Sequence, residues 1–144
     1  MSRTATVTRV TRETAVAVTL DLDGSGTAEV GTGVGFFDHL LTSLAHHALF
    51  DLTVRTEGEM EIDDQHTVVD TALVLGEALA GALGDRSGIV GYGDAAVPMD
   101  VALAIAAVDV GGRPYAVVDL ELATERIGDL TTQNLPHALE ALCR

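Results

Sequence analysis

Histidines beside carboxylates are the first residues in this sequence that suggest chemistry. In the segment Asp63-Asp64-Gln65-His66-Thr67-Val68-Val69-Asp70, His66 and Asp70 are one helical turn apart and therefore share a helix face. An imidazole and a carboxylate in that arrangement can bind a cation such as manganese or zinc. The alternative is structural: Asp64 caps the helix, His66 makes a local hydrogen bond and Asp70 is solvated.

Other candidate side chains also leave two interpretations open. His39 follows Asp38, which can simply be a favourable carboxylate at a helix N-terminus beside a partly buried imidazole. Arg113 can bind an anion through two hydrogen bonds or be an exposed turn residue. Glu13 can act as an acid or base, or form a surface ion pair in a strand. His46 is expected to face solvent.

The first half of the chain must position these groups with strands and helices. Residues 5–22 are rich in Val and Thr, and Asp23-Gly24-Ser25-Gly26 precedes a short apolar stretch at 27–30, which predicts a hairpin. Apolar residues at helical spacing predict a helix over 36–48, and residues 50–62 are typical of a strand. Asp63 and Asp64 are N-cap candidates for a second helix that ends near Gly84.

The second half repeats part of this pattern. Residues 101–110 and 115–122 flank Gly111-Gly112-Arg113-Pro114, which predicts a second hairpin. A helix with His137 near its start is expected to follow, as a helix with His39 near its start follows the first hairpin. We therefore expect one domain with a first pseudo-repeat over about 1–88 and an incomplete second one over about 89–144. An incomplete half leaves a sheet face and edge uncovered, which predicts a homo-oligomer, either trimer-based or a dimer that covers the incomplete half.

Composition limits the class of protein. The chain has 144 residues, 47% of them hydrophobic, which suits one globular domain. A net charge of −14 without any Lys argues against nucleic acid and anionic membrane surfaces as partners. The apolar runs stop short of the ~20 residues of a membrane span. A single cysteine, Cys143, and no apolar leader predict a cytoplasmic protein.

Short motifs in order along nearly the whole chain carry a family resemblance. They are Arg12-Glu13-Thr14, Leu22-Asp23-Gly24-Ser25-Gly26, Thr32-Gly33-Val34-Gly35-Phe36-Phe37-Asp38-His39-Leu40-Leu41, Phe50-Asp51-Leu52, Ile62-Asp63-Asp64-Gln65-His66-Thr67, Gly76-Glu77-Ala78-Leu79, Pro98-Met99-Asp100, Gly112-Arg113-Pro114-Tyr115 and His137. Together they resemble the imidazoleglycerol-phosphate dehydratase family. The resemblance implies an α+β fold of duplicated ribosomal-protein-S5-domain-2-like halves, each a four-stranded sheet with two helices on one face, assembled into trimers and a 24-mer.

The resemblance also implies a chemistry and its residues. The family's site holds two manganese ions between subunits, where a metal-bound imidazole loses a proton and water leaves the glycerol-phosphate chain. Of the family's ligands, His39, His66 and His137 are present, whereas Gln65 and Val69 replace a His and a Glu. Glu13 and Asp100 match acids that contact substrate. Arg113 remains from the phosphate contacts, while Gly91 replaces an Arg.

These departures lead to a functional hypothesis. Retained acids and imidazoles with lost ligands predict a metal-independent lyase, isomerase or cyclase that acts on a small molecule without a cofactor. Glu13 or Asp100 removes a proton in this hypothesis, and His39, His66 or His137 returns one. Arg113 and Gln65 are then the expected substrate-binding side chains. One alternative is an authentic dehydratase, truncated or completed by another chain that restores manganese binding. A further alternative is a non-catalytic binding or scaffold protein.

Overall fold

A four-stranded sheet forms the N-terminal half of the computed structural model, which describes residues 2–144. The strand order is β1-β2-β4-β3; β1, β2 and β4 pair antiparallel, while β3 runs parallel to β4. The strands are β1 (Thr4–Val10), β2 (Thr14–Asp21), β3 (Ala28–Gly31) and β4 (Asp51–Gly58). Side chains alternate along β2, so that Val16, Val18 and Leu20 are buried on one face.

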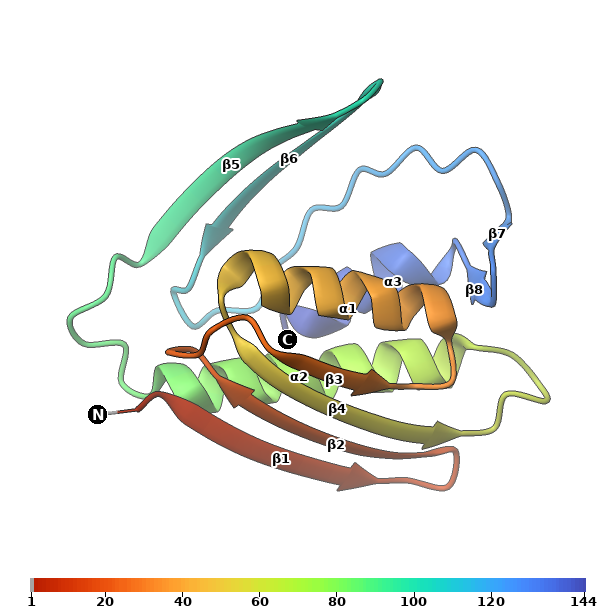
Figure 1. Cartoon of the computed structure of the whole chain (residues 1–144), viewed down its shortest axis with the longest axis horizontal. Helices are drawn as coiled ribbons and strands as arrows, with labels where there is room; N and C mark the ends of the chain where they lie inside the picture. The colour runs from red at the N-terminus through yellow and green to blue at the C-terminus, as the bar shows by residue number, and fades with distance from the viewer. Residues whose placement is uncertain (1) are drawn as a thin grey trace.

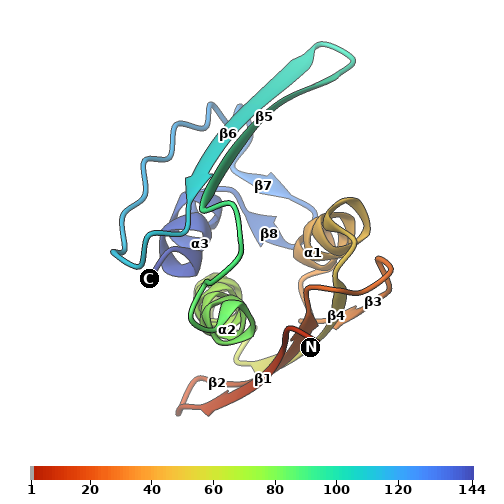
Figure 2. The same ribbon diagram turned by 90° about the vertical axis from the view of Figure 1, so that its left-hand side faces the viewer.

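Helices cover that apolar face. The helices are α1 (Gly35–Ala48), α2 (Gln65–Leu83) and α3 (Asn134–Leu142). α1 and α2 lie directly on the sheet, and α3 packs against α2 on the side away from the sheet (Figures 1 and 2). α2 is long and apolar enough to span a membrane by length and composition. Its buried positions, from Thr67 to Ala82, instead make it the central helix of the core.

The second half of the chain is more open. β5 (Tyr92–Met99) and β6 (Ala102–Asp109) form an antiparallel hairpin that projects away from the helices, and every residue in it is exposed (Figure 1). A minimal second hairpin, β7 (Arg126–Ile127) and β8 (Leu130–Thr131), leads into α3. The segment between β6 and β7 contains no helix or strand.

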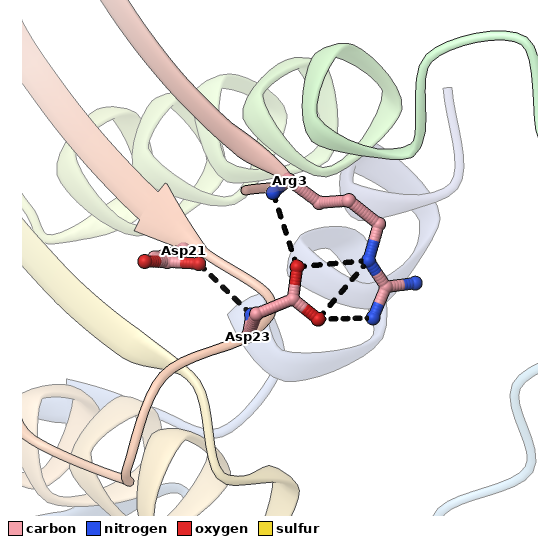
Figure 3. Close-up of polar contacts among 3 residues, drawn as sticks. All are labelled: Arg3, Asp21 and Asp23. Atoms are coloured by element: carbon pink, nitrogen blue, oxygen red, sulfur yellow. Dashed lines mark hydrogen bonds and ion pairs between the residues drawn. The ribbon is translucent and has the colours of Figure 1, made fainter. Parts of the chain in front are cut away.

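An ion pair connects the start of β1 with the end of β2, at the end of the sheet away from the first residues of α1 and α2. The guanidinium of Arg3 donates to both carboxylate oxygens of Asp23, with a closest distance of 2.7 Å, and the backbone N–H of Arg3 donates to the same carboxylate (Figure 3). The Asp23 backbone N–H in turn donates to Asp21. Hydrogen bonds from the Arg3 side chain and backbone lower the pKa of Asp23 to about 2.

The fold class is confirmed, and so are the two N-terminal helices, with α1 starting one residue earlier than predicted. Both predicted hairpins are wrong. The first turn falls at residues 11–13, where the Thr11 hydroxyl accepts the backbone N–H groups of Glu13 and Thr14 and thereby replaces the usual Gly or Asn turn signal. The second turn falls at Asp100, which adopts a left-handed φ of 51°, and residues 115–122 form no strand.

The order of elements bears on the proposed duplication. The first half runs hairpin, strand, helix, strand, helix, whereas the second half runs hairpin, minimal hairpin, helix. In the first half, β3 pairs with β4, the strand that follows α1. The extended segment before β7 has no such partner among residues 2–144. The two pseudo-repeats therefore remain a prediction.

Candidate active site at the helix starts

The three helices begin at the same end of the molecule (Figure 1). The β7–β8 hairpin joins them there. Thr131 of β8 is hydrogen-bonded to Asp64, the residue before α2, and only two residues separate Thr131 from the start of α3. At its turn, Gly128 lies against Phe36 in the first turn of α1, since a Cβ at Gly128 would be 4.0 Å from that of Phe36. Short connections therefore fix the three helix starts relative to one another.

Each helix carries one of the predicted histidines near its start. His39 lies in the second turn of α1, His66 is the second residue of α2, and His137 is the fourth residue of α3. All three side chains are exposed. The His137 imidazole lies 3.8 Å from the carboxylate of Glu140. As expected, His46 also faces solvent, near the far end of α1.

Glu13 and Gln65 lie at the same end as these histidines. Glu13 is in the β1–β2 turn, and its carbonyl accepts the backbone N–H of Glu59, in the loop that leads to α2. Gln65 is the first residue of α2 and is exposed. Five of the residues singled out from sequence therefore share one end of the fold, on four separate elements.

Asp100 and Arg113 lie elsewhere in the chain. Asp100 is at the tip of the β5–β6 hairpin (Figure 1). Arg113 follows β6 and, with Asp109, Gly111 and Tyr115, lines an open cavity of about 360 Å³. A single chain does not bring either residue to the histidine end, and their roles in substrate binding or catalysis remain predictions.

The described residues of one chain do not assemble the two-manganese site that the family resemblance implies. Among residues 2–144, no three side chains of the His, Cys, Asp or Glu type lie close enough to hold a metal ion. Val69, at the position of a family carboxylate, is half-buried against the core and offers no donor. The donor set of one chain therefore does not fit that group.

Three aspartates at this end bind threonines. Asp38 accepts both the backbone N–H and the hydroxyl of Thr32, and Asp64 accepts the same two groups of Thr131. Asp70 accepts the hydroxyl of Thr14 at 2.6 Å. Sequence reasoning treated these carboxylates as caps, solvated groups or metal ligands. No side-chain hydrogen bond caps α2 from Asp64, and the true partners lie too far along the chain for spacing to reveal them.

Asp64 is the most buried of these carboxylates, with 2% of its surface exposed. Burial raises its pKa, but hydrogen bonds from the Thr131 hydroxyl and backbone, with a contribution from Asn134, outweigh burial and hold the pKa below its usual value. The resulting negative charge at the start of α2 also interacts favourably with the helix dipole.

Comparison with known proteins decides which family this site belongs to. The family model for imidazoleglycerol-phosphate dehydratase matches residues 32–144. The dehydratase of Chloroflexus aggregans is 52% identical over 98% of this chain and 69% of its own length, and that of Methanosarcina barkeri is 51% identical over 97% and 73%. The chain belongs to the imidazoleglycerol-phosphate dehydratase family.

Solved structures of the family share the fold. The imidazoleglycerol-phosphate dehydratase of Staphylococcus aureus superposes with a TM-score of 0.85 and 28% identity, covering 97% of this chain and 77% of that one. The dehydratase of Pyrococcus furiosus, crystallised in complex with (S)-C348, gives a TM-score of 0.79 and 28% identity over 94% and 72% of the two chains.

These relatives overturn the leading functional hypothesis. A metal-independent isomerase or cyclase on a borrowed scaffold is not supported, because curated relatives about half identical over nearly the whole chain are named as dehydratases. That hypothesis gave the replaced positions, Gln65, Val69 and Gly91 among them, more weight than the motifs retained along the rest of the sequence. The alternative, an authentic dehydratase and thus a lyase of histidine biosynthesis, agrees with these relatives.

Proposed function

We propose that this chain is an imidazoleglycerol-phosphate dehydratase whose reaction takes place at the helix-start end. The observation that carries the proposal is the conjunction of close sequence similarity to dehydratases with His39, His66 and His137 on three helix starts at one end of the fold. We place Glu13 and Gln65 beside the substrate at the same end, and we place the protein in the cytoplasm.

The helix starts support binding of a phosphorylated substrate. The first backbone N–H groups of a helix lack partners within the helix and carry partial positive charge, which favours phosphate. None of the three N-cap residues, Val34, Asp64 and Gln133, caps its helix through its side chain, although at α2 the backbone N–H of Gln65 donates to the Asp63 carboxylate. Such local positive charge is needed here, because the chain as a whole carries a net charge of −14.

We further propose that manganese binds only where another chain adds donors to His39, His66 and His137. One chain offers three exposed imidazoles on separate elements and no carboxylate at Val69. These exposed imidazoles can share a metal ion with side chains of a neighbouring subunit. Gln65, which is also exposed, adds a neutral oxygen. The active form is then an oligomer rather than a single chain.

Exposed apolar surface on the β5–β6 hairpin supports the same oligomeric form. One face carries Val97, Met99 and Val108, the other carries Leu103 and Ile105, and all five side chains are at least 59% exposed. An antiparallel hairpin normally presents polar groups on any face that meets water. We propose that copies of this chain cover at least one of these faces.

The test of the proposed function is an activity assay on the native assembly. Purified protein should dehydrate imidazoleglycerol phosphate when manganese is present and lose the activity after chelation. His66→Ala should reduce kcat/KM at least ~100-fold, the order of one general acid–base group. His46→Ala is the matched control, since His46 is exposed at the far end of α1, and it should leave activity unchanged. Absence of dehydration by the manganese-loaded native assembly would refute the proposal.

A further inference from the structure

A buried carboxylate at the start of α2 is hydrogen-bonded to β8, the strand that leads into α3. One oxygen of Asp64 accepts the hydroxyl of Thr131 and the other accepts the Thr131 backbone N–H, each at 2.7 Å. The two residues are 67 positions apart in sequence, and only 2% of the Asp64 surface is exposed. Both oxygens of this carboxylate have a hydrogen-bond donor, and the two residues are far apart in sequence. The contact therefore constrains how α2 and β8 lie relative to each other.

Both partners stand next to elements that carry proposed active-site histidines. Asp64 immediately precedes α2, two residues before His66. Thr131 ends β8, and α3 with His137 begins three residues later. In that short link, the backbone N–H of Leu135 donates to the Thr132 carbonyl, which further restricts how α3 begins.

The same device recurs at the first helix. Asp38 accepts the backbone N–H and hydroxyl of Thr32, in the loop that leads to α1, immediately before His39. There both partners belong to one local segment, whereas the Asp64–Thr131 contact crosses between separate parts of the chain. The Asp64–Thr131 contact therefore affects the relative placement of His66 and His137, whereas the Asp38–Thr32 contact affects the shape of one loop.

We propose that Asp64 and Thr131 are positioning residues that hold His66 and His137 in the relative geometry needed for dehydration. This inference rests on the proposed function for its catalytic consequence. The Asp64 carboxylate and the Thr131 donors are hydrogen-bonded to each other, so we do not expect them to bind substrate directly. Displacement of catalytic side chains by about 1 Å can lower rates ~100-fold, so loss of the contact should act mainly on kcat.

The test compares Thr131→Val, which removes the hydroxyl at nearly constant volume, with Thr131→Ser, which keeps it. Thr6→Val is the matched control, because the Thr6 hydroxyl pairs with Thr19 on the exposed face of the sheet. Asp64→Asn is a second variant: its amide would present a donor to one of the two Thr131 donors and should act in the same direction more strongly. Each variant is measured for kcat, KM and hydrogen–deuterium exchange of residues 59–70 and 126–142.

We expect Thr131→Val to lower kcat about 10- to 100-fold with KM changed less than about threefold, and to speed exchange in both segments together. Thr131→Ser should restore both properties, and Thr6→Val should change neither. Wild-type kcat in Thr131→Val, or failure of Thr131→Ser to restore a lost kcat, overturns the inference. If the wild-type assembly does not dehydrate the substrate, the proposed function fails, and unchanged exchange in both segments of Thr131→Val then rejects the positioning role independently.

Discussion

At the scale of single residues, the helix-start end combines exposed histidines with engaged aspartates. His39, His66 and His137 remain free to meet a ligand or a neighbouring subunit because their side chains are exposed. Asp38, Asp64 and Asp70 are instead bound to threonines. The helical spacing of His66 and Asp70 correctly placed both on one helix but did not reveal that Thr14 binds the carboxylate.

The Thr14–Asp70 hydrogen bond gives a prediction about stability. Thr14 is 3% exposed and donates to the half-buried Asp70 at 2.6 Å. Thr14→Val leaves that carboxylate without the donor and should lower the free energy of unfolding by about 1–3 kcal/mol. Denaturant unfolding measures the loss. Thr14→Ser keeps the hydroxyl and should recover most of it; equal losses in the two variants would show that packing, not the hydrogen bond, matters there.

The Arg3–Asp23 pair predicts a pH dependence of stability. The pKa of Asp23 is about 2 in the folded chain and 3.8 ordinarily, so folding favours the ionised form. Its contribution is fully present above about pH 4 and disappears as the pH falls toward 2. The difference in unfolding free energy between wild type and Asp23→Asn should therefore shrink across that window. Arg3→Gln should show the same pH dependence, and a difference constant from pH 7 to pH 2 would contradict the assignment.

At the scale of elements, α2 organises the molecule because it contacts both the sheet and α3. Its close approach to α3 depends on Gly76, where an added Cβ would overlap the backbone carbonyl of Leu142. Farther along the same helix, a Cβ at Gly81 would meet only the methyl group of Ala5, at 3.3 Å. The two glycines therefore differ in what a methyl group would displace.

Gly76→Ala should destabilise the fold although alanine is the better helix former. The methyl group must push α3 away from α2, at a cost of about 1–3 kcal/mol, whereas the gain in helix propensity is about 1 kcal/mol. Gly81→Ala is the control and should cost less, because its contact with Ala5 at 3.3 Å is relieved by a far smaller shift than the overlap at Gly76. Thermal unfolding of both variants measures the difference. A Gly76→Ala protein as stable as Gly81→Ala would show that α3 is not packed as described.

At the scale of the whole molecule, the two halves differ in the polarity of the side chains that they expose to water. The outward face of the N-terminal sheet carries exposed polar residues such as Thr6, Thr8 and Arg55, while the β5–β6 hairpin exposes apolar side chains on both faces. A chain with so much exposed apolar surface gains free energy by association. The hairpin is therefore where we expect subunit contacts.

A charge on the hairpin should dissociate the assembly. Ile105 is 75% exposed in the single chain, and Ile105→Lys would bury an unpaired ammonium at a subunit contact. Sedimentation velocity should show a smaller species for this variant, with far-UV circular dichroism unchanged. Thr8→Lys, on the polar face of the N-terminal sheet, is the control and should leave the assembly intact. An Ile105→Lys protein with wild-type sedimentation would exclude this hairpin as a contact.

The sequence by itself determined the N-terminal helices and the family. Hydrophobic periodicity is a property of neighbouring residues, so it predicted α1 and α2, and ordered motifs identified the dehydratase resemblance. Hydrophobic periodicity did not predict the strand pairing. It does not mark Thr11 as a turn residue, and it does not show that β3 pairs with β4. Tertiary structure alone decided that three helix starts meet and that Asp64 binds Thr131. Those contacts join segments far apart in the chain, and their energy depends on distances that exist only once the core has formed.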